Sequence, residues 1–160
     1  MQWEKVSDIS LITSLIVLAV FAGLGAYQWF TRKSFKKVDH PLLAMIVPLV
    51  LMVAVYIIFD KFIVLATRPN GSGESSFPST HTMIVTTIFF MVMIALPRYV
   101  HSKVLRIILD FVMLMLISLT AAGRVFSNMH HLTDVLGALG FSIVFTGIYY
   151  LISKEDTEDE

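Results

Sequence analysis

The sequence predicts an all-α fold, an integral membrane bundle of about five transmembrane helices that forms a single domain over residues 1–160. The first observation is composition. Hydrophobic residues make up 56% of the chain and charged residues only 15%, whereas about a quarter of an ordinary soluble domain is charged. The second is that the apolar residues form long continuous stretches, with a mean hydropathy of +0.78 for the chain. The third is that these stretches lack the alternation of a membrane β-strand. Lipid is therefore the expected solvent.

The apolar stretches are long enough to cross a bilayer, because about 20 helical residues span roughly 30 Å of hydrocarbon. The first, second and fifth meet this length directly, and the third meets it if its helix begins near Ser79. The fourth contains Arg106 and Asp110 and requires Arg106 to lie at the interface. The first exceeds the roughly 7–15-residue core of a signal peptide, so we expect it to be retained. The expected spans are residues 9–31, 41–60, 79–97, 104–123 and 132–153, followed by an acidic, solvated tail at 154–160.

The basic residues are distributed unevenly between the two sides of such a bundle. With five spans, the loops near residues 31–40 and 97–106 lie on the same side as the C-terminus, and eight of the 12 Lys and Arg residues fall there. The positive-inside rule places this side in the cytoplasm. We therefore expect a multi-pass protein of the plasma (inner) membrane with a cytoplasmic C-terminus. The outer side then carries the other basic residues, which are Lys5, Lys61, Arg68 and Arg124.

Polar residues gather at the outer ends of the expected spans. They are Lys61, Arg68, Ser79, Thr80, His81, Arg124, His130 and Asp134. Two of the cations are guanidinium groups, whose fork of N–H donors suits phosphate oxygens. Two of the expected helices also begin on this face, and a helix N-terminus offers free N–H groups and the positive end of its dipole to an anion. The set therefore predicts a binding site for a phosphate group.

Two histidines accompany this expected phosphate site. His130 and Asp134 are four residues apart, so they share a helix face, and a carboxylate on one ring nitrogen raises the basicity of the other. This makes His130 a candidate nucleophile toward phosphorus, while His81 is placed to protonate the leaving oxygen. Each residue alone has a simpler explanation, such as a snorkelling anchor or a helix cap. The combination on one face is what indicates chemistry.

The order and spacing of these residues resemble the three motifs of the type 2 phosphatidic acid phosphatase superfamily of membrane lipid phosphatases. The matching residues are Lys61, Arg68 and Pro69 for K-x6-R-P, then Pro78, Ser79 and His81 for P-S-G-H, then Arg124, His130 and Asp134 for S-R-x5-H-x3-D. The resemblance runs from Lys61 to the end of the fifth span and leaves the first span outside. Thr80 stands where this family usually has Gly, and Gly123 stands where it usually has Ser.

The resemblance implies a role for each residue. His130 would form a phosphohistidine, Asp134 would orient it, and His81 would be the general acid. The phosphate oxygens would be bound by Lys61, Arg68, Ser79, Thr80 and Arg124. No metal and no other cofactor is implied. Thr80 would be unfavourable if its position needs a positive φ, and Gly123 lacks a hydroxyl that would contact phosphate.

The expected partners are a lipid phosphate substrate and the membrane lipids, because the site lies at the outer boundary of the bilayer. The outward loops are short and leave little protein to recognise a large headgroup. This favours undecaprenyl diphosphate, which would be converted to the monophosphate carrier used for envelope glycans. Phosphatidylglycerophosphate and phosphatidic acid remain alternatives. A phosphotransferase also remains open, since a phosphohistidine can transfer its group to an alcohol.

Other functional classes fit the sequence less well. The formal net charge of zero excludes a strongly basic nucleic-acid binder, and the absence of Cys excludes a thiolate metal site. A carrier or lipid-binding bundle would use an ionisable group inside the membrane, for which Asp110 is the candidate, but an i,i+4 pair with Arg106 explains Asp110 more simply. A metal site at His130, His131 and Asp134 is disfavoured because adjacent helical side chains point about 100° apart. The oligomeric state stays open.

Overall fold

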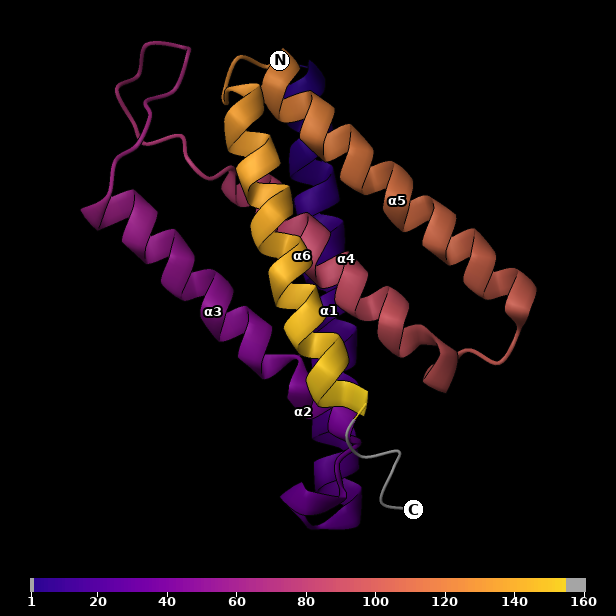
Figure 1. The fold of residues 1–160 in the computed structure, drawn as a ribbon. Helices are drawn as coiled ribbons and strands as arrows, with labels where there is room; N and C mark the ends of the chain where they lie inside the picture. The colour runs from indigo at the N-terminus through magenta and orange to yellow at the C-terminus, as the bar shows by residue number, and fades with distance from the viewer. Residues whose placement is uncertain (1, 155–160) are drawn as a thin grey trace.

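The computed structural model describes residues 2–154, so the acidic tail expected after Lys154 lies outside the described residues. Five helical segments are long and apolar enough to cross a membrane. They are α1 (Gln2–Arg32), the segment His40–Phe62, α4 (Thr80–Tyr99), α5 (Lys103–Phe126) and α6 (Leu132–Lys154) (Figure 1). Within residues 2–154 the only β pairing is an isolated bridge between Thr67 and Ser75. The all-α membrane bundle predicted from the sequence is confirmed.

The first helix is longer than its expected span, because α1 begins at Gln2 and not near residue 9. Glu4, Lys5 and Asp8 interrupt the apolar run but not the helix, since Glu and Lys are good helix formers and Asp costs little. At about 1.5 Å per residue, the 31 residues of α1 extend well beyond the roughly 30 Å of a hydrocarbon layer. The first turns of α1 therefore reach the end of the bundle that carries the polar motifs.

The second span is not one regular helix. A short helix, α2 (His40–Ala44), is followed by a break and then by α3 (Ile46–Ile57). The break comes one turn before Pro48, which has no N–H to bond the carbonyl of Ala44. At its other end α3 continues into a π-helical turn, η2 (Ile58–Phe62), where the amide of Ile63 donates to the carbonyl of Ile58 at 2.9 Å. A π turn changes the direction of the side chains that it carries, and Lys61 is one of them.

The central helix of the bundle is α4. It contacts α1, α5 and α6, and 61% of its most apolar stretch is buried, against 17% for α1 and for α5. Its fully buried apolar side chains include Met83, Val85, Ile88, Phe89 and Met91. By contrast, α3 leans away from α6 toward the end of the bundle where the polar motifs lie (Figure 1). The start of α4 is thus a buried scaffold, and α3 flanks it loosely.

At the opposite end of the bundle, Asp39 joins three segments through contacts that we call the Asp39 clasp, formed by Asp39, Gln28, Arg32 and Tyr99. The carboxylate of Asp39 accepts hydrogen bonds from Gln28 Nε2 at 2.8 Å, Arg32 Nη1 at 2.9 Å and Tyr99 Oη at 3.3 Å. Burial raises the pKa of Asp39, but the hydrogen bonds from Gln28 and Arg32 and the charge of Arg98 outweigh it and hold that pKa below its usual value. The clasp ties the end of α1 to the start of α2 and the end of α4.

The ion pair expected between Arg106 and Asp110 does not form among the described residues. Both side chains line a shallow pocket on α4 and α5, together with Lys103. Within residues 2–154, however, no ion pair joins them, and Oδ1 of Asp110 is buried without a hydrogen-bond partner. The i,i+4 spacing places the two side chains on one helix face but does not hold the guanidinium against the carboxylate. Asp110 therefore lacks the partner that the sequence interpretation assigned to it.

Candidate active site

The polar motifs meet at one end of the bundle. There α4 begins, α5 ends, residues 127–131 lead into α6, and loop 63–79 leads from η2 into α4. Loop 63–79 folds back on itself, because the amide of Arg68 donates to the carbonyl of Glu74 at 3.0 Å and the amide of Ser76 donates to the carbonyl of Ala66 at 2.9 Å. This fold-back brings Arg68 and Ser76 close to the first turn of α4.

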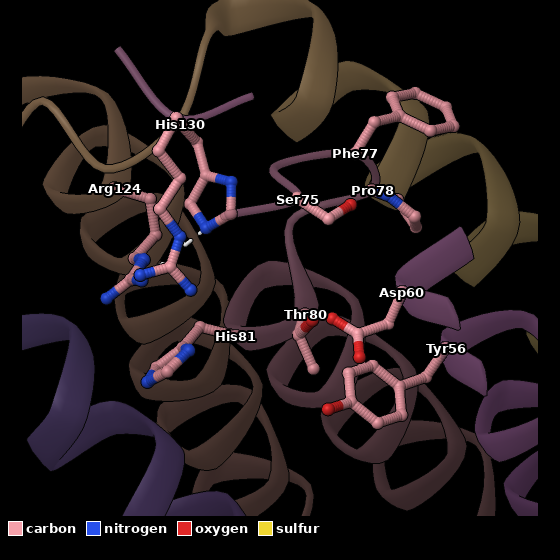
Figure 2. Close-up of a pocket in the computed structure, with 10 residues that line it drawn as sticks. Tyr56, Asp60, Ser75, Phe77, Pro78, Thr80, His81, Arg124 and His130 are labelled. Carbon is pink, nitrogen blue, oxygen red and sulfur yellow. Dashed lines mark hydrogen bonds between the residues drawn. The ribbon is translucent and has the colours of Figure 1, made fainter. Parts of the chain in front are cut away.

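These segments surround a cavity of about 240 Å³ (Figure 2). Five of the site residues expected from the sequence line it, and they are Arg68, Thr80, His81, Arg124 and His130. The remaining lining residues are Tyr56, Asp60, Ser75, Phe77 and Pro78. Figure 2 shows the two histidines and Arg124 on one side of the cavity, with Tyr56 and Asp60 across from them. The fold thus brings both histidines and two of the three expected phosphate-binding cations to one space.

His130 is held in a defined tautomer. Its Nδ1 lies 2.8 Å from the carbonyl oxygen of Ser76, and because a carbonyl can only accept, Nδ1 carries the proton. Nε2 is then unprotonated in the neutral ring and lies 3.4 Å from Nη2 of Arg124, within the cavity. Burial and the neighbouring Arg124 charge lower the pKa of His130 to about 4, and the hydrogen bond to Ser76 and the charge of Asp134 only partly oppose this. His130 is therefore neutral near pH 7, the form that a nucleophile needs.

Asp134 does not make the hydrogen bond to His130 that its spacing suggests. Its Oδ2 lies 3.8 Å from Nδ1 of His130 and accepts the amide of His131 at 2.8 Å. Asp134 is the third residue of α6, so this contact is one half of a capping box, in which the side chain satisfies the amide just before the helix. Its Oδ1 is buried and has no hydrogen-bond partner. In the described structure, the Ser76 carbonyl orients His130, and Asp134 acts on it through its charge and through the start of α6.

The two arginines provide the positive charge of the cavity. The side chain of Arg124 is only 5% exposed, and Nη1 of Arg68 lies 2.6 Å from Oε2 of Glu74 in the same loop. The Nε atoms of both arginines are buried without a hydrogen-bond partner. A buried N–H without an acceptor is costly, and a phosphate oxygen is an acceptor that suits a guanidinium fork. These donors fit the phosphate group that the sequence predicts.

Two residues expected to bind phosphate do not line the cavity. The side chain of Lys61 is 69% exposed and pairs with Oδ2 of Asp60 at 2.7 Å, while Asp60 itself lines the cavity. Asp60 and Lys61 lie in the π-helical turn η2, where side chains point in other directions than they would on a regular α-helix. Ser79 is fully buried, and its hydroxyl bonds that of Thr82 at 3.0 Å. Its amide donates to the carbonyl of Asp134 at 3.1 Å, which joins α4 to α6.

The structure explains both departures from the motif pattern. Thr80 is the first residue of α4, and the non-glycine residues with positive φ in the described chain are Lys33 and Asn128, so Thr80 is not strained. At Gly123, a Cβ would lie 2.8 Å from the carbonyl oxygen of Trp3. That distance is too short for any side chain, because backbone atoms of α1 already occupy the space. Glycine at this position therefore permits the close approach of α1 to α5.

Three further residues at the site have no place in the motifs. Asp8 of α1 lies 3.2 Å from Nε2 of His81 and 4.0 Å from Nη1 of Arg124, measured from its Oδ1. Asp60 and Tyr56, four residues apart, form the opposite wall of the cavity. The sequence signal for Asp8 was an acidic residue at the outer end of a span, the same kind of signal that identified Arg68 and Lys61. It was overlooked because α1 lies outside the motif region.

A second, apolar groove adjoins the cavity. This groove runs between α3 and α4 and is lined by Met52, Val53, Tyr56, Thr80, Met83 and Ile84. Tyr56 and Thr80 line both spaces. The polar cavity and the apolar groove therefore adjoin at Tyr56 and Thr80.

His131, the neighbour of His130, is turned toward loop 63–79, where its Nε2 lies 3.1 Å from the carbonyl oxygen of Thr67. No group of three or more His, Asp or Glu side chains with metal-binding geometry occurs within residues 2–154. The adjacent histidines thus have different partners, and both precede α6, so the spacing argument for a helix does not apply to them.

A sequence profile of the PAP2 superfamily matches residues 12–158 of the chain. The match includes most of α1, so the expectation that the first span lies outside the family resemblance is wrong. Among solved structures, the fold is similar to the crystal structure of a transmembrane PAP2-type phosphatidylglycerolphosphate phosphatase from Bacillus subtilis. The TM-score is 0.69 at 19% identity, and the similarity covers 98% of this chain and 78% of that chain. No curated protein is significantly similar to the chain in sequence.

Proposed function

This chain belongs to the PAP2 superfamily and is a multi-pass membrane protein, and from that premise we propose that it is a lipid phosphatase acting through a phosphohistidine at His130. One observation carries the proposal. Nε2 of His130 is unprotonated and lies in a cavity beside the guanidinium of Arg124, where a phosphate group would be held next to the nucleophile.

The reaction follows from these positions. Arg68 and Arg124 hold the phosphate oxygens while the lone pair of His130 Nε2 attacks phosphorus. The bond from phosphorus to the leaving oxygen breaks, and His81 gives that oxygen a proton. Water then attacks the phosphohistidine, His81 takes a proton from the water, and the P–N bond breaks to release phosphate and restore His130.

The apolar groove supports a lipid as the substrate. A phosphate bound in the cavity would carry its tail past Tyr56 and Thr80 into the groove between α3 and α4. Apolar side chains line the rest of that groove, and burying a hydrocarbon chain against them is favourable. A soluble phosphate ester would gain nothing from this surface, so the groove favours a membrane lipid.

Within lipids, undecaprenyl diphosphate is our first candidate substrate. Loop 63–79 and residues 127–131 leave little protein over the cavity to recognise a large headgroup, so recognition by phosphate and tail is expected. Phosphatidylglycerophosphate is the second candidate, and the fold similarity to a phosphatase named for that lipid favours it. The distribution of basic residues supports a cavity on the outer face of the plasma membrane and a cytoplasmic C-terminus.

The proposal is tested by phosphate release from the purified protein in detergent, with chelator present. Undecaprenyl diphosphate and phosphatidylglycerophosphate are compared, and His130→Ala is the control. We expect release that disappears in His130→Ala, together with an acid-labile phosphate on the wild-type protein. The faster lipid identifies the substrate class. A folded wild-type protein that releases no phosphate from either lipid would refute the proposal.

A further inference from the structure

A carboxylate of the first helix reaches the general acid. Oδ1 of Asp8 lies 3.2 Å from Nε2 of His81, and within residues 2–154 it is the only carboxylate paired with that ring. The His81 side chain is 26% exposed, so its ring sits partly out of water, and the Asp8 side chain is 49% exposed. Nδ1 of His81 has no hydrogen-bond partner in the described part of the chain. One ring nitrogen is therefore engaged by protein, and the other is available.

We propose that Asp8 is a positioning residue for His81, which holds the Nε2–H so that Nδ1 exchanges the proton with the substrate. The inference rests on the function proposed above. A carboxylate can only accept, so Nε2 must be the donor in this contact. With its Nε2 proton held, the imidazolium can give up only the proton on Nδ1. Asp8 thus selects the reacting nitrogen and limits rotation of the ring.

The proton balance is complete with these two residues. When the bond from phosphorus to the leaving oxygen breaks, its electron pair stays on that oxygen and takes the Nδ1 proton. His81 is then neutral, with Nε2–H still donated to Asp8. In the second step, Nδ1 accepts a proton from the attacking water, and the imidazolium is restored. Asp8 remains ionised throughout and gains no proton.

The position of Asp8 depends on the close approach of α1 to α5. A Cβ at Gly123 would lie 2.8 Å from the carbonyl oxygen of Trp3 and 3.5 Å from Cβ of Ser7. The ring of Trp3 packs on Phe126 with 5.2 Å between centroids. Glycine at position 123 lacks the hydroxyl that is usual in the motif, but it leaves room for α1, the helix that carries Asp8, to pack close to α5. The glycine at position 123 and the carboxylate of Asp8 therefore belong to the same packing arrangement.

The same carboxylate would have a different effect if it competed with phosphate for Arg124. The distances favour His81 as its partner, since Oδ1 of Asp8 is 3.2 Å from the imidazole and 4.0 Å from the guanidinium. The two roles predict opposite results for a variant without the charge. If Asp8 competes with phosphate, removing its charge should raise activity. If Asp8 positions His81, removing its charge should lower activity.

The test compares two substrates that differ in their need for a proton. The leaving group of phosphatidic acid is diacylglycerol, which departs as a strongly basic alkoxide unless His81 protonates its oxygen. The leaving group of p-nitrophenyl phosphate is p-nitrophenolate, which is stable as an anion. We expect Asp8→Asn to lower kcat/KM about tenfold or more on phosphatidic acid and less than about twofold on p-nitrophenyl phosphate. Asp8→Glu should retain more activity than Asp8→Asn. In a His81→Ala background, Asp8→Asn should cause no further loss.

Glu4→Gln is the matched control, because it removes a carboxylate one helical turn earlier that makes no ion pair with His81 in residues 2–154. It should leave both activities within about twofold. Equal losses on both substrates in Asp8→Asn, or a gain of activity, would overturn the inference. If the wild type hydrolyses neither substrate, the proposed function fails separately. The ¹⁵N NMR signal of His81 Nε2 then tests the contact, which is refuted if Asp8→Asn leaves that signal unchanged.

Discussion

The two ends of this bundle use charged side chains in opposite ways. In the Asp39 clasp, one carboxylate accepts hydrogen bonds from Gln28, Arg32 and Tyr99, and its charge is balanced by two arginines. At the candidate active site, the Nε atoms of Arg68 and Arg124 and one carboxylate oxygen of Asp134 are buried without hydrogen-bond partners. The clasp is a completed network, and the cavity is an incomplete one.

The difference shows how a small membrane protein separates stability from function. A satisfied network lowers the energy of one arrangement of helices, and it gains nothing from a ligand. Unsatisfied donors raise the energy of the folded chain, and a ligand that supplies acceptors recovers that energy on binding. Substitutions at the clasp should therefore affect mainly stability, and substitutions at the cavity should affect mainly activity.

The largest effect is expected for Arg124→Ala. The change removes the guanidinium beside Nε2 of His130, and we expect kcat/KM for phosphate release to fall by about 10²–10³. Folding should be little affected, because the variant also removes a buried cation with an unpartnered Nε. Phosphate release and thermal unfolding in detergent measure the two quantities. A large fall in melting temperature with nearly normal activity would contradict the division between the two ends.

Asp39→Asn should show the reverse pattern. It weakens the acceptor of the clasp and removes the counter-ion of Arg32, so we expect a loss of about 1–3 kcal/mol in the free energy of unfolding. The kcat/KM of the folded protein should stay within about twofold of the wild type. Because folding lowers the pKa of Asp39, its stabilisation is complete above its usual pKa of about 4 and is lost as the pH falls through the folded value.

Asp110→Asn is the matched control for Asp39→Asn. Asp110 is also a carboxylate in the described bundle, but it has no ion pair there, and its Oδ1 has no hydrogen-bond partner. Thermal unfolding in detergent should show no loss of stability in this variant. If both substitutions lowered the melting temperature equally, the clasp would have no special role.

Gly123→Ser tests whether the close packing of α1 against α5 supports the cavity. It restores the hydroxyl of the motif but places Cβ 2.8 Å from the carbonyl oxygen of Trp3. We expect a loss of about 1–3 kcal/mol in stability from this overlap, and lower activity because α1 and Asp8 must move. Gly140→Ala in α6 is the control, since nothing lies within 4 Å of its Cβ position, and it should be neutral or stabilising. Activity above the wild-type level in Gly123→Ser would refute the link between Gly123 and Asp8.

The protonation of His130 should make folding stability depend on pH. With the pKa of His130 at about 4, the ring stays neutral from pH 7 down to about pH 5, whereas a histidine with the ordinary value near 6.5 would be mostly protonated at pH 5. The unfolded chain binds this proton between about pH 6.5 and 4 and the folded chain does not, so folding stability falls as the pH drops through that range. An NMR titration of His130 checks the value. A midpoint near 6.5 would show that burial beside Arg124 does not control this group.

Most of the fold follows from local properties of the sequence. The five spans are predicted because each is a long apolar helix, and a helix satisfies its own backbone in lipid. The break before Pro48 follows from a rule for proline, but the π turn at Ile58–Phe62 does not, because no residue type requires it. That turn places Asp60, and not Lys61, on the cavity wall.

The candidate site was predictable in its main members and not in their partners. Arg68, His81, Arg124 and His130 come together because helix ends that share one face of the membrane meet at one end of a small bundle. The partner of His130 was expected from i,i+4 spacing, which applies only if both residues are helical. His130 precedes α6, so its Nδ1 is free to reach the carbonyl of Ser76, and Asp134 bonds the amide of His131.

The sequence by itself therefore determined the solvent of this protein, the number and order of its membrane helices and the residues that meet at one end. These properties depend on composition, periodicity and spacing, which are local along the chain. Only the tertiary structure decided which atoms face one another, including the pair Asp8 and His81 and the direction of Lys61. Such contacts join helices far apart in sequence. They depend on helix rotation and on close approaches such as the one that Gly123 permits, and a shift of about one residue changes the face that a side chain occupies.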